Sequence, residues 1–119
     1  MLEIIKMMNE DEMISAHLYS NHTEYLGDCV LYDFYTIHQD KKVQKIRLQI
    51  TIIAEKVSKV VEMENRINGL LLTLGDNNLT DNILQVEQNG GGSLFDENRR
   101  KYHRYLYYDI IKRGVIEND

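Results

Sequence analysis

The chain of 119 residues has the commonest length of a single folded domain, and we expect one domain over residues 1–119. Its 14 Lys and Arg stand against 19 Asp and Glu, and the resulting net charge of −5 disfavours general binding to a phosphate backbone. A single cysteine, Cys29, excludes an internal disulfide, and no apolar run is long enough for a secretory signal or a membrane span. These features fit a protein made in a reducing cytoplasm, with Cys29 as a buried, inert thiol.

The first 27 residues predict a short or broken helix followed by a loop. Asn9 and Glu12 resemble a capping pair that continues the helix for one or two turns through His17. Residues 19–28 show no regular period and end in a Gly-Asp pair, which indicates a loop. The helical stripe that opens the chain consists of three apolar residues: Leu2, Ile5 and Met8.

A hairpin is predicted next. Residues 29–37 are rich in β-branched and aromatic side chains, as is typical of a strand. Residues 38–42 are polar and break this pattern, which favours a turn between antiparallel strands. Residues 43–54 alternate again and form the second strand. The side chains expected on one face of each strand are Val30, Tyr32 and Phe34, followed by Ile46, Leu48, Ile50 and Ile52.

A long helix follows the second strand directly, because the apolar period changes there from two to about 3.6 residues. We expect the helix to stop at Gly75, since that glycine and residues 76–78 are typical of the turn past a helix end. Its apolar stripe contains six residues: Val57, Val60, Met63, Ile67, Leu70 and Leu74.

The last third of the chain predicts a second hairpin. Residues 82–88 alternate as a strand, residues 89–99 form a glycine-rich connection, and residues 101–112 form a long strand. Residues 114–119 are acidic, and we expect them to be frayed. The inward face of the last strand is expected to carry Tyr102, Leu106, Tyr108 and Ile110.

The predicted order of elements is αββαββ. Hairpins and helices that are segregated in this way are typical of an α+β fold. The arrangement that satisfies this order is one antiparallel four-stranded sheet with the helices packed on one of its faces.

No residue pattern in the chain predicts catalysis. The glycine run 90–92 lacks the Gly-Lys-Ser/Thr ending of a P-loop and precedes a strand, which favours a bulged or flexible hairpin connection. The four histidines have no metal-ligand spacing, and no nucleophile elbow of the G-x-S-x-G type is present. We therefore predict no catalytic, cofactor-binding or metal-binding residues, and a protein that is not an enzyme.

Aromatic side chains are expected on both faces of strand 101–112. Tyr105 and Tyr107 lie opposite Leu106 and Tyr108, and neighbouring basic residues give a pattern found on surfaces that stack single-stranded bases. Sheet packing and contact with a protein neighbour explain the tyrosines more simply, because tyrosine joins a large apolar body to a polar tip. A small nucleic-acid-binding module and an oligomeric adaptor of unknown partner remain alternative functions.

Residues 28–113 resemble the tail completion or tail terminator proteins of long-tailed bacteriophages and prophages. The resemblance is carried by the strand-to-helix passage at 47–74, by the order of elements and by the final hairpin, whose second strand begins with the basic-aromatic run RKYHR at 100–104. Residues 1–27 contribute least to it. It implies an α+β subunit that assembles as a ring, expected to be a hexamer, at the head-proximal end of the tail tube.

The same resemblance implies the partners: other copies of this chain, the tail-tube protein and the head-connector protein. The ring would match the last ring of the tube on one side and present a different surface on the other, so that tube growth ends. DNA would pass through the ring without specific binding, and a negative net charge is compatible with that passage. The protein would be made in the bacterial cytoplasm and reside in the virion tail, with no membrane contact and no cofactor.

The candidate assembly contacts lie on the two hairpin connections and on the outer face of the last strand. Loops on a rigid scaffold commonly carry such contacts. The residues are His38, Gln39, Asp40, Lys41, Lys42, Gly90, Gly91, Gly92, Phe95, Arg99, Arg100, Tyr105 and Tyr107.

Overall fold

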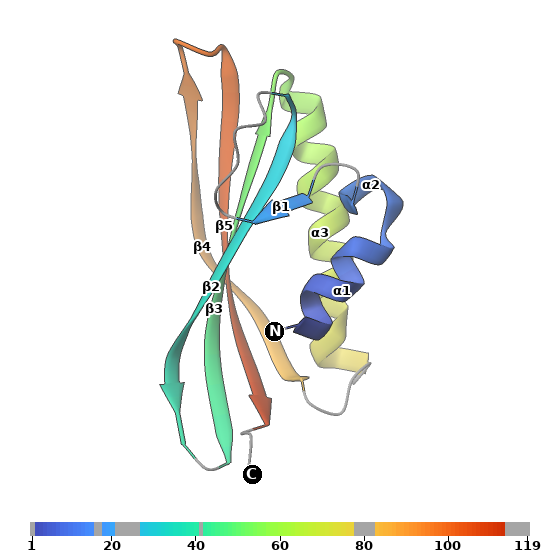
Figure 1. The fold of residues 1–119 in the computed structure, drawn as a ribbon, viewed down its shortest axis with the longest axis vertical. Helices are drawn as coiled ribbons and strands as arrows, with labels where there is room; N and C mark the ends of the chain where they lie inside the picture. Colours follow the sequence, from blue (N-terminus) through green and yellow to red (C-terminus); the bar gives the residue numbers. More distant parts are fainter. Residues whose placement is uncertain (1, 16–17, 21–26, 41, 78–82, 114–119) are drawn as a thin grey trace.

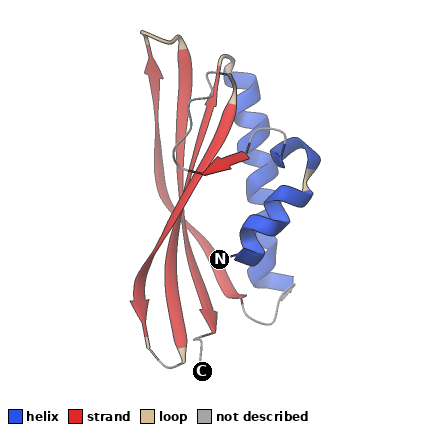
Figure 2. Ribbon diagram, in the orientation of Figure 1, coloured by secondary structure: helices blue, strands red, loops and turns tan. Residues whose placement is uncertain are grey.

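A layer of helices covers one face of a long twisted sheet in the computed structural model, which describes residues 2–15, 18–20, 27–40, 42–77 and 83–113 (Figures 1 and 2). The sheet has five strands in the order β1-β2-β3-β5-β4. All neighbours are antiparallel except β1 and β2, which are parallel. The helices are α1 (Leu2–Glu10), α2 (Glu12–Ser15) and α3 (Val57–Asn77), and the strands are β1 (Leu18–Ser20), β2 (Cys29–Gln39), β3 (Val43–Ala54), β4 (Ile83–Asp96) and β5 (Lys101–Arg113).

The predicted α+β class and the order of helices and hairpins are confirmed, and β3 has the predicted bounds. The four predicted antiparallel strands are present in one sheet, and β1 adds a short fifth strand, which was not predicted, parallel to β2. Tyr19 and Ser20 were assigned to a loop, but they lie in β1. A three-residue strand held by pairing with residues 30–32 has no period of its own to reveal it.

The core lies between α3, α1, α2 and the sheet. Successive strand residues point to opposite faces, so that every second residue of β3 and β5 enters the core. Burying these apolar side chains supplies most of the favourable free energy of the fold. The fully or almost fully buried members on the sheet are Val30, Ile46, Leu48, Ile50, Ile52, Ala54, Ile83, Val86, Leu106, Tyr108 and Ile110, and those on the helices are Ile4, Met8, Ile14, Val60, Met63, Ile67 and Leu71.

The apolar stripe of α3 differs from the prediction in three places. Leu71 is fully buried and was not predicted, whereas Leu70 is only partly buried and Val57 is 51% exposed. The side chain of Leu74 lies outside the described residues. Residues 75–77 continue the helix instead of ending it, because helical geometry tolerates these residues at a modest cost in free energy.

The break between α1 and α2 is capped by a residue other than the predicted one. The backbone N–H of Ile14 donates a hydrogen bond to Oδ1 of Asp11 at 3.2 Å, so Asp11, not Asn9, caps α2. The other carboxylate oxygen, Oδ2, accepts from Nε of Arg66 on α3 at 2.7 Å. Asp11 therefore both starts α2 and attaches the N-terminal helices to α3.

Two polar contacts fix α3 on the sheet. Arg104 of β5 donates from Nε and Nη2 to the two carboxylate oxygens of Glu64 at 3.0 and 3.3 Å, and this pairing raises the pKa of Arg104. The buried hydroxyl of Tyr108 donates to Oδ1 of Asn68. Burial raises the pKa of Tyr108 above its usual value of 10.0, so the hydroxyl keeps its proton and stays a donor.

Tyr108→Phe should lower the free energy of unfolding by about 1 kcal/mol, because Asn68 loses a buried hydrogen bond while the ring still fills the core. Urea denaturation measures this difference. Tyr105→Phe, on the opposite face of the same strand, is the matched control and should change stability by less than about 0.5 kcal/mol. Equal effects of the two substitutions would show that the hydrogen bond to Asn68 does not contribute to the free energy of unfolding.

Candidate assembly surfaces

The two outer strands of the sheet leave long edges open within the described chain. β4 borders β5 on one side, and no described strand lies on its other side. β2 borders β3, but its outer neighbour β1 reaches only from Val30 to Tyr32. Residues 33–39 of β2 therefore form a second open edge. Open edges present backbone hydrogen-bonding groups and are ready to accept a further strand.

Exposed apolar side chains gather on these same two strands. The described chain has eight large apolar side chains that are exposed, and six of them lie on β2 and β4. Their exposed fractions lie between 38% and 48%. Exposed apolar side chains that are concentrated on the outer strands, rather than scattered over the surface, are typical of a surface that contacts another protein. The six residues are Phe34, Tyr35 and Ile37 on β2, and Leu84, Leu94 and Phe95 on β4.

The turn between β2 and β3 contains fewer residues than predicted. His38 and Gln39 are strand residues that pair with Lys45 and Gln44, although residues 38–42 were assigned to a turn. Asp40 closes the actual turn. Phe34, which was expected to face the core, is 43% exposed on the outer strand β2, although its partner on β3, Leu48, is fully buried.

Hydrogen bonds to one carboxylate hold this turn in shape. Oδ1 of Asp40 accepts from the backbone N–H of Lys42 and of Val43, both at 2.8 Å. These two bonds, followed by a weaker contribution from His38, lower the pKa of Asp40. Nε2 of His38 lies 3.6 Å from Oδ2 of Asp40. Of the predicted contacts at this tip, Lys41 lies outside the described residues.

The β4–β5 hairpin projects at the opposite end of the molecule (Figure 1). Oδ1 of Asp96 accepts from the backbone N–H of Asn98 and of Arg99 at 3.0 and 3.2 Å, which closes the turn. Arg100 adopts a left-handed conformation with φ of 55°. The predicted contacts Arg99 and Arg100 therefore lie in a turn of defined shape at the end of the sheet.

The glycine run lies within a strand, although residues 89–99 were assigned to a connection. β4 continues through Gly90, Gly91 and Gly92 to Asp96, with a register shift opposite β5 between Gln88 and Gly91. Two of the glycines have positive φ, 93° at Gly90 and 156° at Gly91. The expected bulge is present, but it interrupts a strand instead of ending one.

The sheet face away from the helices carries Tyr105 and Tyr107 together with a buried acidic residue that the sequence did not single out. Asp109 is 6% exposed. Its carboxylate accepts from Nε and Nη2 of Arg47 at 2.9 and 3.3 Å, and from Nδ2 of Asn89 at 2.7 Å. These contacts, the bond from Arg47 foremost, hold the pKa of Asp109 below its usual 3.8. The network joins β3, β4 and β5 on this face.

A shallow groove lies between the start of α3 and the β4–β5 hairpin. Its volume is about 360 Å³, and Val57, Val60, Phe95 and Tyr102 contribute to its walls. The rings of Phe95 and Tyr102 pack with centroids 4.7 Å apart. The predicted contact Phe95 thus forms one wall of an apolar depression beside the hairpin.

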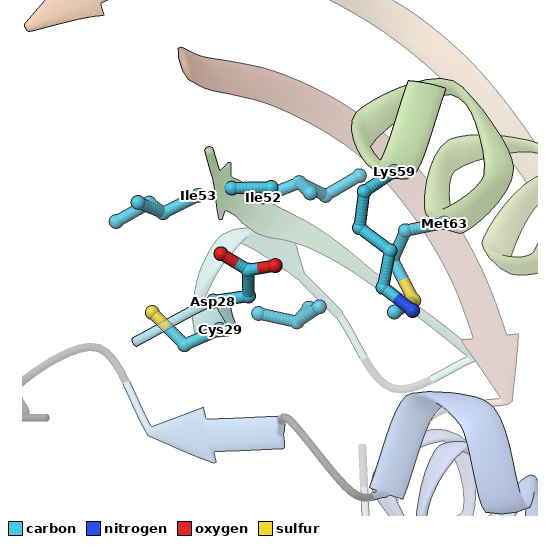
Figure 3. A pocket seen from close by; sticks show the side chains of 8 residues that line it. Asp28, Cys29, Ile52, Ile53, Lys59 and Met63 are labelled. Carbon is cyan, nitrogen blue, oxygen red and sulfur yellow. The ribbon is translucent and has the colours of Figure 1, made fainter. Parts of the chain in front are cut away.

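A second pocket, shown in Figure 3, lies between β2, β3 and the first turns of α3. It holds about 10 Å³, which is the space of a single water molecule. Asp28 and Cys29 lie on one side of it, and Lys59 and Met63 approach from α3. Cys29 is buried, and burial raises the pKa of its thiol. The pocket is too small for an organic ligand.

The predicted contact residues thus occupy three separate places. His38, Gln39, Asp40 and Lys42 lie at one end of the sheet, and Phe95, Arg99 and Arg100 lie at the other. The third place is the stretch between these ends on β4 and β5, which carries Gly90, Gly91, Gly92, Tyr105 and Tyr107. Within the described ranges, no three His, Cys, Asp or Glu side chains gather as metal ligands. None of the described helices combines the length and apolar character needed to cross a bilayer.

The fold has a counterpart among solved structures. The chain is similar to a chain in the virion of a native gene transfer agent (GTA) particle, with a TM-score of 0.69 and 10% sequence identity. The match covers 93% of this chain and 92% of that chain. No family model matches the sequence, and no curated protein matches it. At this level of identity, the likeness establishes a shared fold.

Proposed function

We propose that this protein is a structural subunit of a phage-like virion that closes the head-proximal end of the tail tube as a ring. The observation that carries the proposal is the match in fold to a virion chain of nearly the same extent, 93% of one chain against 92% of the other. The resemblance of residues 28–113 to tail terminator proteins supports the specific place in the tail. The proposed ring has six copies, and its partners are the tail-tube protein and the head-connector protein.

The two ends of the sheet support a capping role because they differ. The β2–β3 tip is narrow and polar around Asp40 and Lys42, whereas the β4–β5 end combines Arg99 and Arg100 with the apolar groove beside Phe95. A ring of parallel subunits has different upper and lower faces. One face binds the last tube ring, and the other, which the tube protein does not match, receives the head connector.

The electrostatics suit a ring through which DNA slides. The net charge of −5 disfavours tight retention of phosphates. Two of the basic residues on β5 that a nucleic-acid-binding module would use are held by carboxylates: Arg104 by Glu64, and Lys101 by Asp28 and Glu55 at 3.5 and 3.4 Å. The alternative of a nucleic-acid-binding module is therefore less well supported than assembly.

Purified protein added to polymerising tail-tube protein of the same particle should produce tubes of shorter mean length, with one ring at one end. Electron microscopy measures both quantities. The shortening should grow with the ratio of this protein to tube protein, since each ring stops one tube end. Unchanged tube lengths, or binding along the whole tube, would refute the capping role.

A further inference from the structure

The open edges of β2 and β4 have the polarity needed to pair with each other in neighbouring copies. Three successive antiparallel pairings, β2 with β3, β3 with β5 and β5 with β4, make β2 and β4 run in opposite directions. A second copy placed beside the first, by rotation about an axis along the strands, therefore brings its β4 antiparallel to the first copy's β2. Antiparallel pairing is the pattern of the sheet beyond β1.

The two edges also lie at the same height along the strands. Tyr35 is paired with Arg47, Arg47 with Asp109, and Asp109 with Glu87. This row across the sheet makes Tyr35 on one edge level with Glu87 on the other. In the same way, Gln39 is level with the start of β4. Residues 33–39 of β2 therefore face residues 84–89 of a neighbour without any shift along the strands.

The composition of these segments favours pairing. Edge strands in soluble proteins are commonly protected from pairing by lysine, proline or a short length. Residues 33–39, DFYTIHQ, contain no lysine, arginine or proline, and residues 84–89, LQVEQN, carry one charged side chain. Large apolar side chains are exposed on both, at Phe34, Tyr35, Ile37 and Leu84. Pairing would remove these side chains from water and satisfy backbone groups along both edges.

We propose that residues 33–39 of β2 pair with residues 84–89 of the next copy, so that the sheets of adjacent subunits join into one continuous sheet. The partner is a second copy of this chain, and the contact joins two different edges. A contact of this heterologous kind closes into a ring when the rotation between copies divides a full turn. The inference rests on the proposed ring and specifies the surfaces that form it.

Disulfide trapping tests this pairing directly. The double variants Tyr35→Cys with Glu87→Cys and His38→Cys with Gln85→Cys place thiols on the two edges at matching heights. Within one chain the edges are three strand spacings, roughly 14 Å, apart, which is too far for a disulfide. Oxidation at high protein concentration should therefore give a ladder of cross-linked species on non-reducing gels, which ends at the number of copies in the ring.

The matched control is Tyr35→Cys with Leu94→Cys, because Leu94 is exposed, as Glu87 is, but lies on the other half of β4. It should yield less than a tenth of the cross-linking of the level pairs. Native Cys29 is 3% exposed and should contribute little background. Absence of a ladder from both level pairs, or an equal ladder from the control, would overturn the edge pairing.

The tube-length assay separates this inference from the proposed function. Capping of tubes without cross-linking of the level pairs would refute the edge pairing and leave the capping role standing. Cross-linked rings that leave tube length unchanged would support the edge pairing and refute the capping role.

Discussion

Replacing Gly91 with alanine should lower the free energy of unfolding by about 2 to 3 kcal/mol. A Cβ at this position would lie 2.3 Å from the carbonyl oxygen of Tyr105, closer than side-chain carbons approach a backbone oxygen in folded proteins. The atom in the way belongs to the backbone of β5, so relief requires the two strands to separate at the bulge. Urea denaturation followed by circular dichroism measures the loss.

The chain supplies its own control one residue further along. A Cβ on Gly92 would meet nothing within 4 Å, and its backbone is not in the left-handed region. Gly92→Ala should therefore change stability by less than about 0.5 kcal/mol. If both variants lose the same stability, the cause is a general need for glycine in this stretch and not the close approach of Tyr105.

Asp109→Asn should lower the free energy of unfolding by about 2 kcal/mol at neutral pH. The carboxylate is buried and binds Arg47, Asn89 and, at 3.8 Å, Lys45, so its neutral replacement leaves the partly buried guanidinium of Arg47 without its counter-charge. Thermal or urea unfolding at several pH values measures the effect. Glu87→Gln, which removes an exposed carboxylate from the neighbouring strand, is the control and should be nearly neutral.

The pH dependence of stability follows from the lowered pKa of Asp109. Because the folded state holds the pKa below its usual 3.8, the unfolded chain takes up the proton first as the pH falls. The stabilisation is complete above pH 4 to 5 and is lost as the pH falls through the folded-state pKa. The Asp109→Asn variant should lose less stability than the wild type over this acid range. Parallel acid profiles of the two proteins would show that Asp109 has no such role.

The sequence was most informative where one element alone sets the period of its side chains. β3 alternates over its full length and α3 repeats at helical spacing, so both elements and most of their buried residues could be predicted. Features that depend on partners far apart in the sequence could not be predicted. Arg47 and Asp109 are 62 positions apart, and only the register of β3 against β5 brings them together.

The hairpin ends were mispredicted for a related reason. His38 and Gln39 are polar, and the run at Gly90 is rich in glycine, so both stretches have turn-like composition. Their neighbours across the sheet nevertheless hold them in strands. The candidate contacts in these two stretches were therefore predicted as loops, whereas His38, Gln39 and the glycine run lie in the outer strands of the sheet. The signal available in the sequence for the open edge of β2 was an aromatic strand segment, residues 33–39, that contains no lysine or proline.

In the proposed ring, the short strand β1 would limit how far a neighbouring subunit can slide along β2. It occupies the outer side of β2 from Val30 to Tyr32, directly above the open segment. A neighbour that slid along β2 in that direction would collide with β1, and one that slid the other way would run past Gln39, the last residue of the strand. Copies that docked between these two limits would be confined in how far each could shift along the strands relative to the next. A confined shift would favour a closed ring over a spiral filament, because closure requires no net rise around the ring.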